Sequence, residues 1–387
     1  PLRQPFFGDT HVHTTLSFDA NSQDTRNSPR DAYRFAQGER MGIQPYDDDG
    51  NALRHVQLDR PLDFVAVTDH AEFLGEMEIC TTPGTWEYWH PVCFAHRNMP
   101  GVGLMAFGFR GLVDKERWGL CGDDGSLCRE KATEVWAEVI AAAEEADDAS
   151  DACSFTSFVA YEWTASVGEG QNLHRNVIFR DAQVPAIPAS WIETPSAVDL
   201  WDRLEAECVE GIKGCDALTI PHNSNLSGGL IFQSAAASSP DEPGPTQLAE
   251  ARRRSRWEPL VEIMQHKGAS ECYFKSGVTR DELCAFESLS QDNIAGFDNP
   301  PQPDTGFVRP PLTAGLALQQ RLGVNPYHFG VIASTDTHLG TPGASREEAF
   351  LGHGGAGTPA GDSVTPGLPD NVEFNPGGLA VVWAREN

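Results

Sequence analysis

Two histidines near the start of the chain have the spacing of metal ligands. His11 and His13 are separated by one residue. Alternate residues of an extended strand point to the same side, so both imidazoles can reach one ion. Asp336 and His338 repeat this spacing near the other end of the chain. Together the two motifs predict a metal site assembled from distant parts of the sequence.

Further apolar runs end abruptly in a histidine or a carboxylate. With the two motifs above and one nearby acid, they give a set of nine expected ligands: His11, His13, Asp19, His70, Glu162, His222, His266, Asp336 and His338. Any one of these histidines could instead be a hydrogen-bonded structural residue. A mixture of imidazole and carboxylate suits zinc, manganese or iron, so we expect about two or three such ions. A bound cluster of this kind would acidify a shared water and favour hydrolysis.

The expected ligands follow segments that have the length and residue content of buried strands. These segments are 6–11, 64–70, 155–162, 217–222, 260–266 and 329–336. Residues 134–145 and 197–210 instead place apolar side chains on one helical face. Strands that alternate with helices predict a parallel α/β sheet, and repetition of this unit can close a barrel with its site at the C-terminal strand ends.

Composition indicates a globular protein and disfavours some partners. The 387 residues are 40% hydrophobic, which is enough to bury a core. The formal net charge of −28 repels nucleic-acid backbones and anionic lipid. No apolar run approaches the roughly 20 residues of a membrane helix. We therefore expect neither a nucleic-acid partner nor a membrane partner.

Eight of the nine cysteines are near neighbours in the sequence. The neighbours are Cys80 and Cys93, Cys121 and Cys128, Cys208 and Cys215, and Cys272 and Cys284, which leaves Cys153 alone. This usage suits disulfides in an oxidising compartment, although spacing does not fix the connectivity. We expect a periplasmic or secreted protein. The alternative is a set of unrelated buried thiols.

We expect a single domain spanning residues 1–387, with insertions at about 75–131, 223–249 and 268–311. These stretches and residues 340–378 read as irregular loops over the barrel mouth. In the first insertion, Trp86, Trp89 and Trp118 could form an apolar wall for an aryl or alkyl ester, or could supply a small core for the loop.

Several motifs resemble those of the PHP (polymerase and histidinol phosphatase) superfamily. They are Gly8-Asp9-Thr10-His11-Val12-His13-Thr14 with Asp19, then Val67-Thr68-Asp69-His70, and finally Ser334-Thr335-Asp336-Thr337-His338. Segments such as Tyr161-Glu162-Trp163, His174-Arg175-Asn176 and Ile220-Pro221-His222-Asn223 resemble a PHP-like secreted bacterial family catalogued as a domain of unknown function. The likeness spans almost the whole chain.

This resemblance implies a distorted (β/α)7 TIM-like barrel of the PHP type with a trinuclear metal site. His11, His13, Glu162 and Asp336 would hold the first ion. Glu162 would bridge to a second ion, which His222 and His266 also hold, with His174 as the rival ligand. Asp19, His70 and His338 would hold the third ion.

The expected function is a metal-dependent phosphoesterase that cleaves small-molecule phosphomonoesters or phosphodiesters with a metal-bridging hydroxide. Arg175 is the first residue to consider for gripping a phosphate, and a salt bridge is its plain alternative. His174 could protonate the leaving oxygen, and the catalytic group would be His174, Arg175 and Asp336. The alternatives are hydrolysis of an amide, lactone or sulfate ester, or a non-catalytic module that binds metal or carbohydrate.

Other residues beside the expected ligands could support the site. Asp9 and Asp69 could orient metal-binding imidazoles, unless they lie on the opposite face of their strands. Asn223 and Lys267 each follow a ligand directly and could line the pocket.

Overall fold

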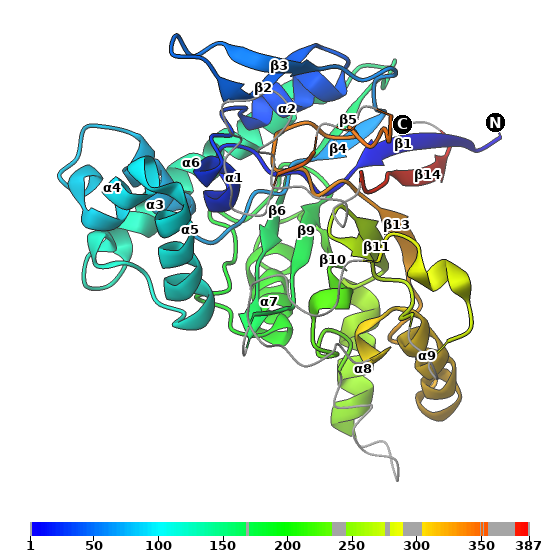
Figure 1. Cartoon of the computed structure of the whole chain (residues 1–387). Coiled ribbons are helices and arrows are strands. Elements are labelled where there is room, and N and C mark those ends of the chain that lie inside the picture. Colours follow the sequence, from blue (N-terminus) through cyan, green and yellow to red (C-terminus); the bar gives the residue numbers. More distant parts are fainter. Residues whose placement is uncertain are drawn as a thin grey trace.

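The computed structural model is a mixed α/β structure with small sheets at its centre and helices around them (Figure 1). It describes residues 2–167, 170–233, 245–274, 279–288, 304–348, 350, 352–354 and 376–385. Within these residues, no helix is long and apolar enough to cross a membrane.

Three sheets contain the strands that lead into the expected site. Their strands are β1 (Gln4–Asp9), β4 (Phe64–Ala66), β5 (Thr156–Phe158), β6 (Ala160–Trp163), β9 (Arg175–Phe179), β10 (Ala217–Pro221), β11 (Leu260–Gln265), β12 (Gly268–Ala269), β13 (Gly330–Ala333) and β14 (Ala380–Ala384). The strand orders are β14-β1-β4-β5, β10-β9-β6 and β12-β11-β13. Two hairpins, β2 (Met41–Tyr46) with β3 (Ala52–Val56) and β7 (Ser166–Val167) with β8 (Gln171–Asn172), lie outside these sheets.

All six strand segments predicted from the sequence contain strands, but the sheets are not purely parallel. β1, β4 and β5 run parallel, and so do β11 and β13. β9 instead runs antiparallel to both β6 and β10, and β14 runs antiparallel to β1. The connection from β6 to β9 is the short β7–β8 hairpin, which is too short for a helical crossover between parallel strands.

The helices are α1 (Phe18–Ser22), α2 (Pro29–Ala36), α3 (Leu74–Thr81), α4 (Pro91–Asn98), α5 (Pro100–Phe107), α6 (Ser126–Ala146), α7 (Ala197–Leu204), α8 (Pro245–Trp257) and α9 (Arg309–Leu322). Both helices predicted from periodicity are present as α6 and α7, and a π-helical segment, η4 (Glu205–Val209), continues α7. Trp136 and Val139 of α6 and Trp201 of α7 are buried in the largest apolar core. These two helices therefore cover the sheets with the faces that their sequences predict.

The first predicted insertion is not an irregular loop. Residues 75–131 contain most of α3, all of α4 and α5 and the start of α6, which Figure 1 shows gathered on one side of the molecule (cyan). Their buried side chains, such as Met77 and Phe107, join Phe73 in a separate core. We refer to residues 73–128 as the helical unit. Helices α3, α4 and α5 have only eight residues each, so two turns give little periodic signal in the sequence.

The other predicted insertions contain short ordered pieces. Residues 223–249 include a single 3-10 turn, Ser224–Leu226, and the start of α8, while positions 234–244 lie outside the described residues. Residues 268–311 include β12, the turns Glu282–Ala285 and Asp304–Gly306, and the start of α9. Within 340–378, only 340–348, 350, 352–354 and 376–378 are described.

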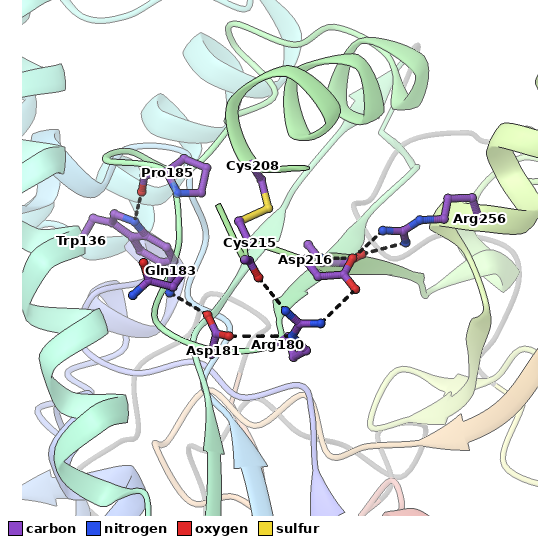
Figure 2. The surroundings of a disulfide bond; sticks show 11 residues. Trp136, Arg180, Asp181, Gln183, Pro185, Cys208, Cys215, Asp216 and Arg256 are labelled. Atoms are coloured by element: carbon purple, nitrogen blue, oxygen red, sulfur yellow. Dashed lines mark hydrogen bonds and ion pairs between the residues drawn. A yellow bond between two sulfur atoms is a disulfide. The ribbon is translucent and has the colours of Figure 1, made fainter. Parts of the chain in front are cut away.

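The four pairs of neighbouring cysteines form disulfides, Cys80–Cys93, Cys121–Cys128, Cys208–Cys215 and Cys272–Cys284, and Cys153 is a free thiol. Figure 2 shows Cys208–Cys215, which ties η4 to the residues before β10. Nearby, Asp216 pairs with Arg180 and Arg256. Four disulfides indicate an oxidising environment.

We expect the disulfides of the helical unit to stabilise it strongly. Replacing Cys80 and Cys93 with serine should lower the free energy of unfolding by about 2–4 kcal/mol, because the sulfurs lie in the core of the unit and the bond restricts the unfolded chain. Urea unfolding followed by circular dichroism measures the change. Cys153→Ser is the control and should unfold at the wild-type urea concentration. Equal stability of the double variant and the wild type would contradict the expectation.

The barrel stays a prediction, because the hydrogen-bonded ladders among the described residues form separate sheets. Two isolated parallel bridges join further segments, Val12 with Thr337 and His70 with Glu162. They bring together the segments that follow β1 and β13, and the segment after β4 with β6. Six of the nine expected ligands lie in these segments: His11, His13, His70, Glu162, Asp336 and His338.

Candidate metal centre

Glu162 and Asp336 lie at the centre of the group of expected ligands. Nε2 of His11 is 3.4 Å from Glu162 Oε2 and 3.2 Å from Asp336 Oδ1. Nε2 of His13 is 3.2 Å from Glu162 Oε2 and 3.1 Å from Asp336 Oδ1. All four side chains are buried. The ligand set expected for the first ion is therefore together in space, and we call it site one.

Two histidines lie at the second oxygen of Glu162. His222 Nε2 is 3.3 Å from Glu162 Oε1, and His174 Nδ1 is 2.8 Å from the same oxygen. We call Glu162, His174 and His222 site two. The sequence placed His266 here and named His174 as the rival, and the structure brings His174 to this oxygen.

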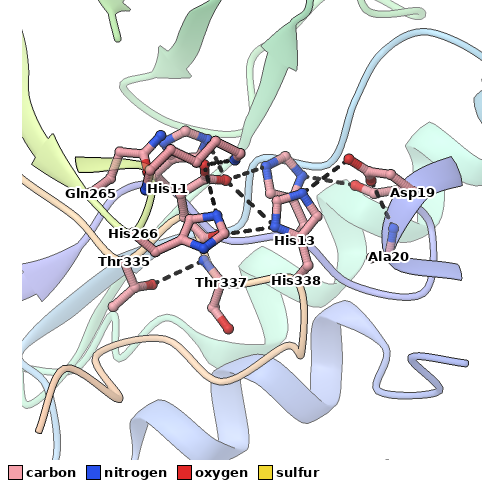
Figure 3. Close-up of polar contacts among 12 residues, drawn as sticks. His11, His13, Asp19, Ala20, Gln265, His266, Thr335, Thr337 and His338 are labelled. Carbon is pink, nitrogen blue, oxygen red and sulfur yellow. Dashed lines mark hydrogen bonds and ion pairs between the residues drawn. The ribbon is translucent and has the colours of Figure 1, made fainter. Parts of the chain in front are cut away.

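His266 lies instead on the Asp336 side of the group. Its Nε2 is 3.3 Å from Asp336 Oδ2, and Lys267 Nζ contacts the same oxygen. His266, Asp336 and His338 place ligand atoms within 4.8 Å of one another. The clustering of His11, His13, His266 and His338 beside Asp19 is visible in Figure 3.

The third expected set is also assembled. Asp19 Oδ2 lies 3.0 Å from His70 Nε2 and 3.0 Å from His338 Nε2. His13 stacks between these two imidazoles, with ring centroids 4.4 and 4.2 Å away. We call Asp19, His70 and His338 site three. Its neighbour His13 belongs to site one, so the two sites are adjacent.

Backbone hydrogen bonds hold the ligand segments side by side. The amide of His13 donates to Thr337 O, and that of Asp336 donates to His11 O. Glu162 N donates to Asp69 O, and His266 N donates to Thr335 O. Asp336 has a φ of 55°, in the left-handed region that few residues other than glycine adopt, and such strain is concentrated at functional sites.

The second ring nitrogen of most site histidines has a hydrogen-bond partner. His11 Nδ1 lies 3.1 Å from Glu262 Oε1, and His70 Nδ1 contacts Thr164 Oγ1 at 2.5 Å. His338 Nδ1 lies 2.9 Å from the carbonyl oxygen of Asp336. When Nδ1 donates, Nε2 keeps its lone pair for a metal. These contacts therefore orient Nε2 of each ring toward the centre of the group.

Asp69 orients a ligand indirectly, whereas Asp9 does not touch an imidazole. Ser17 Oγ donates to Asp69 at 2.6 Å and lies 2.9 Å from His13 Nδ1. Asp9 instead accepts hydrogen bonds from Thr335 Oγ1 and from Gly343 N. Asp9 therefore fixes the backbone beside Asp336, while Asp69 acts on His13 through Ser17.

Arg175 is not placed to grip a phosphate. Its Nε donates to Glu258 Oε1 at 2.8 Å, and its Nη atoms donate to the carbonyls of Leu173 and Ile231. The side chain is 2% exposed. This placement favours the salt-bridge alternative, in which Arg175 anchors the start of β9 next to His174.

The helical unit supports Asp19. Phe18 packs against Phe73 and against the ring of His70, with ring centroids 5.4 and 5.2 Å apart. His96 Nε2 lies 2.8 Å from Asn21 Oδ1, which joins α4 to α1. α1 has only five residues, so these contacts position the Asp19 carboxylate.

The carboxylates of the group are held in the ionised form. Burial would raise the pKa of Glu162, but His70, His174 and His222 hold it well below its usual range. Burial likewise opposes ionisation of Asp336, and His11, Lys267 and His266 hold the pKa of that carboxyl low. Buried anionic oxygens of this kind require positive charge nearby.

The donor set fits a cluster of divalent ions. Buried atoms without a hydrogen bond to any described residue include His11 Nε2, His13 Nε2, both nitrogens of His222 and Asp336 Oδ1. Leaving so many buried polar atoms unsatisfied is costly, and ligation of an ion would satisfy them together. The mixture of imidazole and carboxylate matches zinc, manganese or iron. Several of these buried groups could therefore hold metal ions.

We expect replacement of Asp19 to empty site three selectively. Asp19→Asn should lose about one equivalent of metal, because Asn offers no anionic oxygen to the site, while sites one and two keep their ligands. Elemental analysis of desalted protein gives the stoichiometry. Asp24→Asn changes an acid at an exposed position nearby and should retain the full content. Loss of all metal from the Asp19 variant would contradict separate sites.

Comparison with known protein families gives one match that covers the chain. The family model described as "Protein of unknown function (DUF3604)" matches residues 1–387. No curated protein and no solved structure matches the chain.

Proposed function

The chain belongs to the DUF3604 family, whose model spans all of it, and we propose that it is a metal-dependent phosphoesterase acting on small molecules. The observation that supports this function is the meeting of Glu162 and Asp336 with histidines from distant segments, all with ligand atoms turned to one place. Buried clusters of this composition are suited to hydrolytic chemistry.

The proposed arrangement assigns each ligand to one of three ions. Site one uses His11, His13, Glu162 and Asp336, site two uses Glu162, His174 and His222, and site three uses Asp19, His70 and His338. His266 joins this group through Asp336. When bound, divalent ions supply Lewis acidity toward phosphoester oxygens and make a water molecule a better nucleophile.

Side chains beside the proposed ions would bind the substrate and position the imidazoles. Lys267 is 17% exposed at its side chain, and its ammonium group lies at the edge of the group beside Asp336. It can bind an oxygen of an anionic substrate as a point charge. His174 is 13% exposed at its side chain, so the substrate would approach on this side of site two. Glu262, Ser17 and Thr164 keep the imidazoles in position.

The choice of phosphoester rests on the PHP-like order of the motifs, which we extend to the fold as a proposal. The distorted barrel would be a ring of neighbouring strands. Their order would be β1, β4, β5, β6, β9, β10, β11, β13 and β14, with β14 beside β1. The ladders supply most of the neighbours, and β10 contacts β11 while β13 contacts β14. The ligands would then lie at one mouth of the barrel.

We also propose that the protein works outside the cytoplasm. The four disulfides support this location, because such bonds persist in the periplasm and the exterior and are rare in the cytosol.

The test compares metal content with hydrolysis of a substrate panel. Purified protein should contain divalent metal and should hydrolyse nitrophenyl phosphate or bis-nitrophenyl phosphate. Chelation should abolish this activity, and zinc, manganese or iron should restore it. Nitrophenyl sulfate, a nitrophenyl carboxylate ester and an anilide test the other bonds. Metal-dependent cleavage of one of these without phosphoesterase activity would replace the proposal with that hydrolase.

Lys267→Met should weaken the binding of anionic substrates without removing metal. KM for nitrophenyl phosphate should rise about tenfold, because one charged contact is lost, and Lys267→Arg should recover part of the loss. Steady-state kinetics and elemental analysis of the same samples measure both effects. Lys213→Met removes an exposed lysine elsewhere and is the control. An unchanged KM would show that Lys267 does not bind the substrate.

A further inference from the structure

The helical unit contains a cavity that we call the aromatic cleft, and its lining includes none of the metal-site residues. Its volume is about 540 Å³. Its lining includes Trp86, Trp89 and His90 from one stretch of the chain and Leu120 and Ser126 from another. A cavity of this size is in the range of pockets that hold small organic ligands.

Disulfides hold both stretches of chain that line this aromatic cleft. Cys80–Cys93 joins α3 to α4, which flank the tryptophans in the chain, and Cys121–Cys128 ties the second stretch to the start of α6. Arg97 stacks on the ring of Tyr88 at 3.7 Å and donates to the carbonyls of Cys80 and Tyr88. The cleft is therefore preorganised, which lowers the entropic cost of binding.

The two tryptophans are unusually exposed for their size. Trp86 is 86% exposed and Trp89 is 68% exposed, whereas Trp118 packs against the core of the unit. Tryptophan is mostly buried in folded proteins, and exposed aromatic rings that line a cleft mark binding sites. Trp118 therefore contributes to the core, while Trp86 and Trp89 remain available to a ligand.

The polar groups beside these rings offer one donor and one acceptor. His90 Nδ1 accepts a hydrogen bond from Val92 N, so the neutral ring carries its proton on Nε2. Burial lowers the pKa of His90, which favours that neutral form. The carboxylate of Glu87 has no hydrogen bond or ion pair with another described residue. It can accept hydrogen bonds from hydroxyl groups.

We propose that the aromatic cleft binds a neutral oligosaccharide, with pyranose rings against Trp86 and Trp89 and hydroxyl groups bonded to Glu87 and His90. Pyranose rings present C–H faces to aromatic rings and hydroxyls at their edges, which matches this combination of groups. The strong negative charge of the protein disfavours anionic sugars. The cleft would attach the protein to glycans independently of its proposed hydrolysis.

Titration of the intact protein with neutral hexaoses tests this proposal. The probes are cellohexaose, laminarihexaose, maltohexaose, mannohexaose, xylohexaose and chitohexaose, and tryptophan fluorescence and calorimetry report binding. At least one should bind with a Kd of about 1 mM or tighter. Trp86→Ala and Trp89→Ala should each weaken binding about tenfold, and Glu87→Gln should weaken it severalfold.

Trp383→Ala is the matched control, because Trp383 is 62% exposed but lies on β14. It should bind as the wild type does, and all variants should keep the wild-type metal content and melting temperature. The proposal would be overturned if no hexaose binds. It would also be overturned if Trp86→Ala and Trp89→Ala both bind the sugar as the wild type does. Tetramethylammonium binding without sugar binding would assign the cleft to organic cations instead. If the protein binds the sugar but hydrolyses none of the phosphoesters, only the proposed phosphoesterase function is contradicted.

Discussion

Glu162→Gln should abolish metal-dependent hydrolysis. Glu162 is the residue that contacts His11 and His13 through one oxygen and His174 and His222 through the other. A neutral amide would hold divalent cations far less well than a carboxylate, so sites one and two should both lose metal. We expect kcat/KM to fall about a thousandfold or more, because several kcal/mol of stabilisation is lost and each tenfold in rate corresponds to about 1.4 kcal/mol.

Elemental analysis, kinetics and circular dichroism on the same sample measure this result. Glu258→Gln is the matched control, because Glu258 is as buried as Glu162 but pairs with Arg175 and Arg254 outside the metal group. The Glu258→Gln variant should be less stable than the wild type and should retain its metal. Full metal content and normal activity in the Glu162 variant would show that the Glu162 carboxylate is not needed to hold the metal.

Removal of metal should also destabilise the folded protein. The group contains ionised, buried carboxylates whose positive partners are partly histidines. A bound ion stabilises only the folded state, by about 4 kcal/mol per site when free metal is roughly 1000-fold above Kd. We expect chelation to lower Tm by about 10 °C or more, as a loss of several kcal/mol would.

Differential scanning calorimetry before and after dialysis against a chelator measures this shift, and added metal should reverse it. The Glu162→Gln variant serves as the reference, because its Tm should respond far less to the chelator. An equal response of variant and wild type would mean that the chelator acts elsewhere.

The sequence predicted much of this group of buried histidines and carboxylates because many of its members follow strand ends. His11, His70 and His222 each follow a short apolar run, and the structure brings such ends together. The nearness of His174 to Glu162 was harder to predict, because β9, which begins directly after His174 and pairs with β6, was not recognised as a strand. Register across an antiparallel pair is set by tertiary packing, which local patterns do not contain.

Two other features depend on contacts between distant residues. Arg175 pairs with Glu258 at a separation of 83 residues, which nothing in the local sequence indicates. Glu262 holds His11 from the middle of β11, and a carboxylate inside an otherwise apolar strand was the signal that could have identified it. The helical unit was missed because short helices packed around disulfides lack a long apolar repeat.

The most direct test is a crystal structure of protein purified without chelator, with anomalous diffraction at the zinc, manganese and iron absorption edges. We predict peaks about 2.0–2.3 Å from Nε2 of His11 and His13, from both oxygens of Glu162 and from Nε2 of His70 and His338. Metal peaks that avoid these atoms, or a metal-free site in a protein that remains fully active, would contradict this prediction.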